Sequence, residues 1–123
     1  MIPIPCIQEI EGRLEDAIVN YSRALAINPV DEQSLIGRGS CYTATRQNEL
    51  AVEDFTKLLQ FPEDKRRVPR KHLLYAIAEN YRQLEDWGQA LHWAQKAHTA
   101  DPGNERHREL LEELKKKIRH SKD

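Results

Sequence analysis

Three segments of the chain repeat one order of small and bulky residues, and this repetition limits the possible folds more than any other feature. The segments are EGRLEDAIVNYSRALAINP, TRQNELAVEDFTKLLQFP and LEDWGQALHWAQKAHTADP. They align on Ala17, Ala51 and Ala90, which are 34 and 39 residues apart. Four and seven positions after each alanine come further small or bulky apolar residues: Tyr21 and Ala24, Phe55 and Leu58, Ala94 and Ala97. Spacing of four and seven residues lines one helical face, so each segment predicts a helix with one packed side.

A second helix is predicted before two of these segments. Large apolar, small and aromatic residues recur at helical spacing: Leu35, Gly39 and Tyr42 in one case, Leu74, Ala78 and Tyr81 in the other. A glycine or alanine at the middle position lets two helices approach closely. Each pair of helices is therefore predicted to form a hairpin, closed by Pro62 or Pro102. Asp31, Asp86 and Asn104 are predicted to cap the helices that follow them.

The order of residues and the 34-residue period resemble the tetratricopeptide repeat family. The resemblance implies an all-α, right-handed α-solenoid of antiparallel helix hairpins, with about two and a half repeats. Its expected units within residues 1–104 are an incomplete first repeat (1–30), a second repeat (31–62), a loop insertion (63–70) and a third repeat (71–104). Residues 105–123 are expected to form a capping helix and basic tail, because Leu110, Leu111, Leu114 and Ile118 make an apolar stripe on a polar helix. Two positions depart from the family pattern: Arg38 replaces a usual leucine, and Ala94 an expected aromatic residue. Trp93 or Trp87 is expected to fill the volume that Ala94 leaves.

The first repeat is expected to be incomplete because Pro3 and Pro5 leave only about residues 6–11 free to form a helical turn before the helix at 13–27. The apolar side of that helix would then be partly uncovered. Three explanations stay open: the N-terminal arm folds back as a substitute half-helix, the surface binds a second copy or a partner, or the chain belongs to a longer repeat array. The possible association surface comprises Ile7, Ile10, Leu14 and Tyr21.

The resemblance also implies a concave groove lined by the first helix of each hairpin. It assigns to the groove Gln33, Ile36, Ser40, Thr43, His72, Tyr75, Glu79 and Arg82, with Ala44 and Gln83 beside them. Their mixture of aliphatic, aromatic and charged side chains suits a peptide or a partner helix better than a small metabolite. Ile36, Gly37, Ser40, His72 and Ala76 stand where some family members grip a C-terminal carboxylate with basic residues, so that mode of binding is disfavoured.

Catalysis, cofactors and metal binding find little support in the sequence. The five histidines include no i, i+4 pair, and neither Cys6 nor Cys41 has a histidine at ligand spacing. A net charge of −1 indicates no general attraction to nucleic acid or membranes. With two cysteines and no secretory signal, we expect reduced thiols and a cytoplasmic chain; KRRVPRK at 65–71 leaves a nuclear location or an acidic partner open.

The sequence thus predicts a non-enzymatic adaptor or scaffold that binds a protein or peptide in the groove. The alternative is a structural segment that forms a homodimer or other assembly through its N-terminal half-repeat. RNA binding through the basic loop and tail is a distant third hypothesis.

Overall fold

The computed structural model describes the backbone of residues 7–121 and the side chains of residues 12–119. Within this range all regular secondary structure is helical and there is no strand, as the sequence predicts. The α-helices are α1 (Ile7–Ile27), α2 (Glu32–Ala44), α3 (Asn48–Leu59), α4 (Arg70–Gln83), α5 (Trp87–Ala100) and α6 (Glu105–Ser121), with a 3₁₀ helix at Glu63–Lys65 between α3 and α4.

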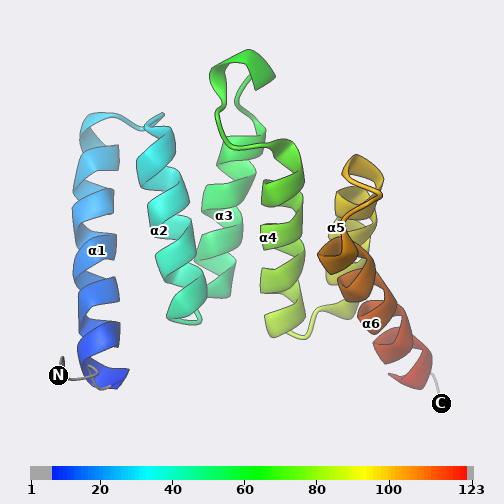
Figure 1. The fold of residues 1–123 in the computed structure, drawn as a ribbon. Helices are drawn as coiled ribbons and strands as arrows, with labels where there is room; N and C mark the ends of the chain where they lie inside the picture. The colour runs from blue at the N-terminus through cyan, green and yellow to red at the C-terminus, as the bar shows by residue number, and fades with distance from the viewer. Residues whose placement is uncertain (1–6, 122–123) are drawn as a thin grey trace, which may run out of the picture.

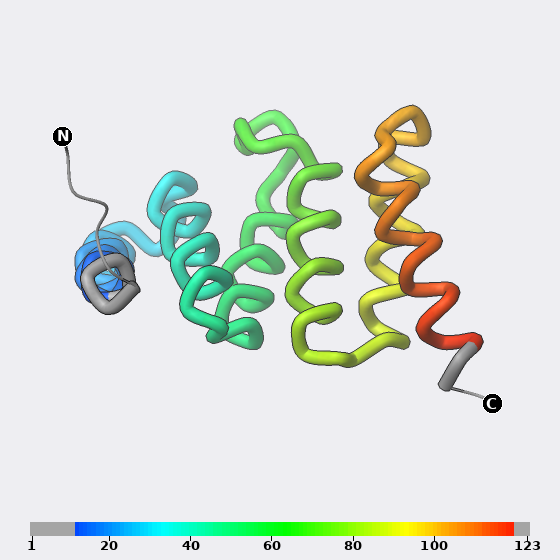
Figure 2. Tube along the Cα trace, turned by 60° about the horizontal axis from the view of Figure 1, so that its bottom comes forward, coloured from blue at the N-terminus to red at the C-terminus, as the bar shows by residue number. Residues whose placement is uncertain are grey.

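Each helix packs against the next one along the chain, which gives a helical solenoid (Figure 1). α2, α4 and α6 lie in a front layer, with α3 and α5 behind them, and Figure 2 shows the same order of helices along the stack. We call the side formed by α2, α4 and α6 the front surface. Short turns join the helices within a hairpin, so neighbouring helices run antiparallel.

The helix ends follow the predicted punctuation with one exception. Asp86 accepts a hydrogen bond from the Gln89 backbone N–H at 3.2 Å, and Asn104 Oδ1 accepts one from the Arg106 N–H at 2.9 Å. Both side chains therefore cap the helix that follows, as predicted. The same prediction for Asp31 is wrong, because its carboxylate accepts a hydrogen bond from the Ser34 hydroxyl at 2.7 Å and makes no cap bond to a backbone N–H.

The predicted start of the first helix is also wrong. α1 is one continuous helix from Ile7 to Ile27, and not a short turn followed by a helix at 13–27. Gly12 lowers helix propensity by about 1 kcal/mol but does not break the helix. Residues 7–12 therefore extend α1 and do not fold back over it, whereas the arm at residues 1–6 lies outside the described part.

One apolar cluster joins the first five helices. Its fully buried members include Leu35, Leu58, Leu73 and Ile77, and Phe55 is 5 % exposed. Gly39 lets the Phe55 ring approach α2, since a Cβ at this position would lie 2.9 Å from two ring atoms. The small residue predicted at the middle of the first helix of this hairpin, α2, is therefore required by close packing.

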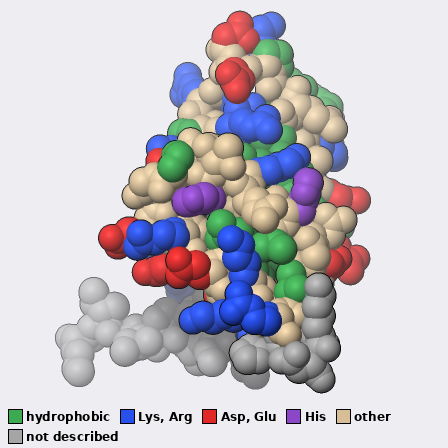
Figure 3. Space-filling model, turned by 90° about the vertical axis from the view of Figure 1, so that its right-hand side faces the viewer, with side chains coloured by type: hydrophobic (Ala, Val, Ile, Leu, Met, Phe, Trp, Pro, Cys, Tyr) green, Lys and Arg blue, Asp and Glu red, His purple; other side chains and the backbone are tan. Residues whose placement is uncertain are grey.

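A second cluster lies under α6. Its buried members come from α4, α5 and α6: Ala78, Ala90, Ala94, Leu110, Leu111 and Leu114. The predicted apolar stripe thus packs against the last hairpin. Trp93 contacts both clusters and Trp87 contacts this one, which fits the expectation that a tryptophan compensates for the small Ala94. Figure 3 shows the outer end of the stack, where Lys, Arg, Asp and Glu side chains are spread among hydrophobic and other side chains.

Arg38 is held by a buried ion pair. Its Nη2 and Nε donate to the two Asp54 carboxylate oxygens at 2.7 and 2.8 Å, and its Nη1 donates to Ser22 Oγ at 3.2 Å. Asp54 is only 2 % exposed, and this hydrogen-bonded carboxylate raises the pKa of Arg38 above its ordinary value. The arginine thereby joins α1, α2 and α3 at a position where the family usually packs leucine.

Candidate functional site

The predicted groove residues lie along the front surface of α2 and α4. Gln33, Ser40 and His72 are exposed, and the rest are half-buried: Ile36, Thr43, Tyr75, Glu79 and Arg82. These residues do not form one continuous groove. Six of the eight divide among three clefts, two of which adjoin, whereas Ser40 and His72 line none of these three.

The first cleft lies where the ends of α2 and α4 meet α6. It has a volume of about 640 Å³ and is lined by Thr43, Ala44, Arg46, Arg82, Gln83, Glu85, Trp87, Glu113 and Lys117. Two of the predicted groove residues, Thr43 and Arg82, are therefore brought together here. Lys117 Nζ lies 5.6 Å from the centre of the Trp87 ring, which is within cation–π distance.

The second cleft lies between α4 and α6. It has a volume of about 540 Å³ and is lined by Tyr75, Glu79, Arg82, Arg106, Glu109, Leu110 and Glu113. Arg82 and Glu113 line both clefts, so the two hollows share one wall. We call them together the α4–α6 clefts.

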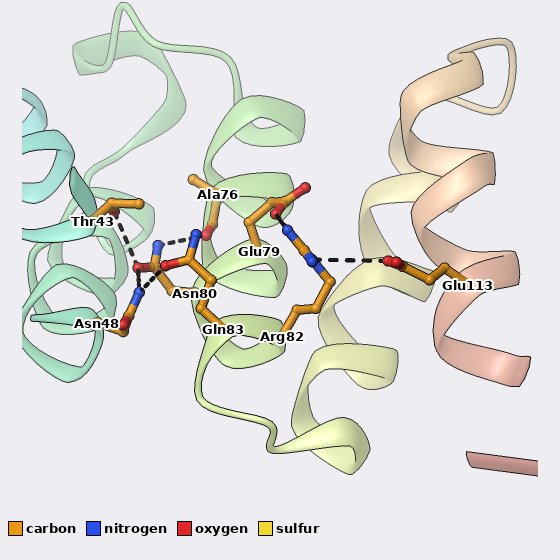
Figure 4. Close-up of polar contacts among 8 residues, drawn as sticks. All are labelled: Thr43, Asn48, Ala76, Glu79, Asn80, Arg82, Gln83 and Glu113. Carbon is orange, nitrogen blue, oxygen red and sulfur yellow. Dashed lines mark hydrogen bonds and ion pairs between the residues drawn. The ribbon is translucent and has the colours of Figure 1, made fainter. Parts of the chain in front are cut away.

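Arg82 is the charged centre of the shared wall. Its Nη2 and Nε donate to Glu79 Oε2 at 2.7 and 3.2 Å, and its Nε lies 3.9 Å from a Glu113 oxygen (Figure 4). The hydrogen bond to Glu79 and the nearby carboxylates raise the pKa of Arg82 above its ordinary value. Because the distance to Glu113 is long and both side chains are partly exposed, this second ion pair contributes roughly 0–1 kcal/mol.

Tyr75 forms the aromatic side of the second cleft. Its ring stacks on the buried His107 ring, with 4.9 Å between centres and 17° between planes. Burial, with the adjacent Glu79 carboxylate, raises the pKa of Tyr75 to about 12. His107 is itself fixed, because its Nδ1 lies 3.0 Å from the Ala97 carbonyl oxygen. The Tyr75 ring is therefore held by α6 in one orientation.

A polar network fixes the floor between α2, α3 and α4. Asn80, 1 % exposed, accepts hydrogen bonds at its Oδ1 from Thr43 Oγ1 at 3.1 Å and from Asn48 Nδ2 at 2.9 Å. Asn48 also donates to Gln83 at 2.7 Å, and Asn80 donates to the Ala76 carbonyl at 2.8 Å (Figure 4). The side chains of Thr43 and Gln83 are thus held by hydrogen bonds within the fold, and these bonds fix their positions in the wall of the first cleft.

Gln33 and Ile36 lie in a third cleft. It has a volume of about 490 Å³ and is lined by Asp31, Glu32, Gln33, Ile36, Arg67 and Val68. This cleft is built by the start of α2 and the inserted loop. The structure therefore separates these two predicted residues from Thr43 at the other end of the same helix.

The sequence prediction missed the contribution of α6 to the site. Arg106, Glu109, Glu113 and Lys117 line the α4–α6 clefts, although residues 105–123 were expected to form only a capping helix and basic tail. The signal was present, since spacings of three, four and four residues place these charges on one helical face. Trp87 was likewise regarded only as a filler of the core.

The possible association surface is described only in part. The side chains of Ile7 and Ile10 lie outside the described residues. Leu14 and Tyr21 are half-buried, and the Tyr21 ring packs so closely on Gly37 that a Cβ at this glycine would overlap it. One side of Tyr21 is therefore already occupied by α2.

Two other findings concern metals and membranes. In the part of the chain that the structure describes, no three His, Cys, Asp or Glu side chains gather where they could hold a metal ion. No described helix combines the length and apolar character needed to cross a bilayer. Cys41 is a buried, unpaired thiol whose pKa is raised by burial, whereas Cys6 lies outside the described residues.

The stacked hairpins define the class of the protein as an α-helical repeat protein. No family model matches the chain. Human tetratricopeptide repeat protein 16 is 33% identical over 69 residues, which is 53% of this chain and 8% of that protein. Mouse tetratricopeptide repeat protein 14 is 33% identical over 75 residues, which is 61% of this chain and 10% of that protein. The chain thus spans at most a tenth of these curated relatives, and over that part its sequence is similar to tetratricopeptide repeat proteins.

Proposed function

We propose that this chain is a non-enzymatic protein-interaction module that binds a peptide or a partner helix at the α4–α6 clefts. The observation that carries the proposal is the pair of adjoining clefts, of about 640 and 540 Å³, which share Arg82 and Glu113. Repeat solenoids typically present such extended binding surfaces. Both relatives are named as tetratricopeptide repeat proteins, which favours a protein partner.

The side chains of the clefts suit a peptide. Tyr75 and Trp87 offer aromatic contact area, the kind of surface that dominates protein interfaces. Arg82 can exchange its long contact to Glu113 for a carboxylate of the partner at little cost in free energy, because the existing pair is weak. Carboxylates and cations of the clefts neutralise one another, an arrangement that favours recognition of a polypeptide over acid–base catalysis.

Selection from a random peptide library tests the proposal. Peptides selected on the immobilised chain should bind Tyr75→Ala and Arg82→Ala variants about tenfold more weakly, a loss of ~1.4 kcal/mol. Lys57→Ala, at an exposed position of α3, is the matched control and should bind as the parent chain does. The proposal is wrong if selection yields no specific peptide, or if the two cleft variants bind every selected peptide as tightly as the control.

A second candidate function is association through α1, and one comparison favours it. Ala51 and Leu58 of α3 and Ala90 of α5 are completely buried. The equivalent residues of α1, Ala17 and Ala24, are only half-buried. An additional helix, from a second copy or from a partner, would complete the burial of this face.

Solution mass measured by light scattering over a wide range of concentration tests this candidate. Association through α1 predicts a mass that rises with concentration and returns to that of a monomer in an Ala17→Glu, Ala24→Glu variant. Val19→Glu, on another side of α1, is the control and should leave assembly intact. A monomer at every concentration would refute self-association.

A further inference from the structure

The inserted loop between α3 and α4 is held in one conformation. The Glu32 carboxylate accepts hydrogen bonds from the backbone N–H groups of Arg67, at 2.8 and 3.0 Å, and of Val68, at 2.7 Å. The Arg66 side chain donates to the carbonyl oxygens of Val68 and Phe61 at 3.0 and 3.1 Å. The basic segment found in the sequence is therefore built into the fold, and Arg70 at its end has a defined position as the first residue of α4.

The charges of this loop are not neutralised within the described structure. Among residues 12–119, Lys71 pairs with Asp101 at 3.4 Å, whereas Arg70 and the loop cations Lys65 and Arg67 form no ion pair. The loop also carries Glu63 and Asp64, which form no ion pair either, and the Glu32 carboxylate lies against its backbone. The four cations at residues 63–70 and these three carboxylates leave a local excess of one positive charge. An unsatisfied local excess of this kind attracts an acidic partner although the whole chain is nearly neutral.

A cleft lies beside this loop, between α4 and α5. It has a volume of about 440 Å³ and is lined by Arg70, Leu74, His92, Gln95, Lys96, Thr99 and Ala100, with no carboxylate among them. Leu74, 1 % exposed, provides an apolar floor, and Arg70 and Lys96 are exposed. Lys96 Nζ lies 4.8 Å from the centre of the Trp93 ring, a contact that restricts its position. We call this hollow the basic cleft.

We propose that the basic cleft binds an acidic peptide segment of a partner protein, with Arg70 and Lys96 contacting its Asp or Glu side chains. Arginine can donate two parallel hydrogen bonds to a carboxylate, and lysine adds a second fixed positive charge. The Gln95 amide can donate to the peptide backbone, and the apolar floor can accept a neighbouring side chain. A hollow with two cations is too small for the row of phosphate contacts that nucleic acids need.

This site is separate from the α4–α6 clefts. Arg70 and Leu74 line the basic cleft, whereas Tyr75, Glu79 and Arg82 line the second cleft, between α4 and α6. The basic cleft and the second cleft therefore lie on different sides of α4. The inference therefore does not depend on the proposed function. An Arg82→Ala variant distinguishes the two proposals. It should lower the affinity for peptides selected on the α4–α6 clefts and leave the affinity for acidic peptides unchanged.

Fluorescence anisotropy with a labelled decapeptide of Asp and Glu, at low ionic strength, tests the inference. We expect saturable one-to-one binding that falls about tenfold in an Arg70→Gln, Lys96→Gln variant and weakens as salt is added. The matched control, Arg23→Gln with Lys57→Gln, removes the same charge from exposed positions of α1 and α3 and should change the affinity less than twofold. Circular dichroism of each variant verifies the helical fold.

Three outcomes would overturn the inference. They are absence of saturable peptide binding, an equal loss in the control variant, and tighter binding of anionic lipid vesicles or of a single-stranded oligonucleotide than of the peptide. The second outcome would mean that overall charge governs binding, and the third that another class of macromolecule uses this surface.

Discussion

Replacing Arg38 by leucine, the residue usual at this position of the repeat, should destabilise the protein strongly. The substitution removes two short hydrogen bonds, of 2.7 and 2.8 Å, from the Asp54 carboxylate, which is 2 % exposed. Bonds to charged groups contribute about 1.5–3 kcal/mol each, and removal of one partner of a buried ion pair typically costs about 3–5 kcal/mol. Because the Arg38 side chain is 17 % exposed and water can reach part of the pair, we expect a loss of about 3 kcal/mol.

Urea denaturation followed by circular dichroism would measure this loss, and a double-mutant cycle would assign it. Arg38→Leu and Asp54→Leu should each lower the free energy of unfolding, whereas the double variant should lie within about 1 kcal/mol of the parent chain, since no buried charge is left unpaired. If Arg38→Leu alone costs less than about 1 kcal/mol, or if the two losses simply add, the pair does not stabilise the fold in the way we derive.

Three further predictions concern packing, backbone strain and titration. Gly39→Ala should lower the free energy of unfolding by about 1–3 kcal/mol, because its Cβ would lie 2.9 Å from the Phe55 ring. Gly88→Ala, with open space around it, should raise the free energy of unfolding by up to about 1 kcal/mol. Equal effects of the two substitutions in chemical denaturation would refute this reasoning. Glu85→Gly should raise the melting temperature, because Glu85 has φ 59°, whereas Glu85→Ala should not. The pKa of Tyr75, raised to about 12 in the folded protein, should make stability fall as the pH rises from ~10 to ~12, and Tyr75→Phe should remove that part of the decline in pH-dependent urea titrations.

The fold could be predicted from the sequence because the same pattern of small and bulky residues occurs in several repeats, and each repeat supports the same interpretation. Ala51 and Ala90 are both completely buried, and the apolar stripe from Leu110 to Leu114 packs where a terminal helix must. The start of α1 was misjudged for a physical reason: prolines bar a helix only near their own positions, and the single Gly12 does not outweigh the fifteen helical residues that follow it.

The site was less predictable, since it depends on which residues of distant segments meet. The helix that carries Tyr75, Glu79 and Arg82 was expected to line the groove. The partners of Tyr75 and Arg82, His107 and Glu113, lie on α6. The spacing of the charges on α6 places them on one helical face, but it does not reveal that this face returns over α4. The Asn80 network was missed for the same reason, because its partner Asn48 is 32 residues away.

The two ends of the stack differ in how function and stability are connected. At the C-terminal end, α6 covers Ala90 and Ala94 and also supplies Glu113 to the α4–α6 clefts, so the same helix completes the core and the proposed binding surface. At the other end, α1 leaves Ala17 and Ala24 half-buried, with no described helix before it. In a linear array each unit is stabilised by its neighbours, so a ligand bound across α4 and α6 should reinforce the end that is already closed. A contact on α1 would instead cover Ala17 and Ala24, so the two proposed surfaces would stabilise different parts of the stack.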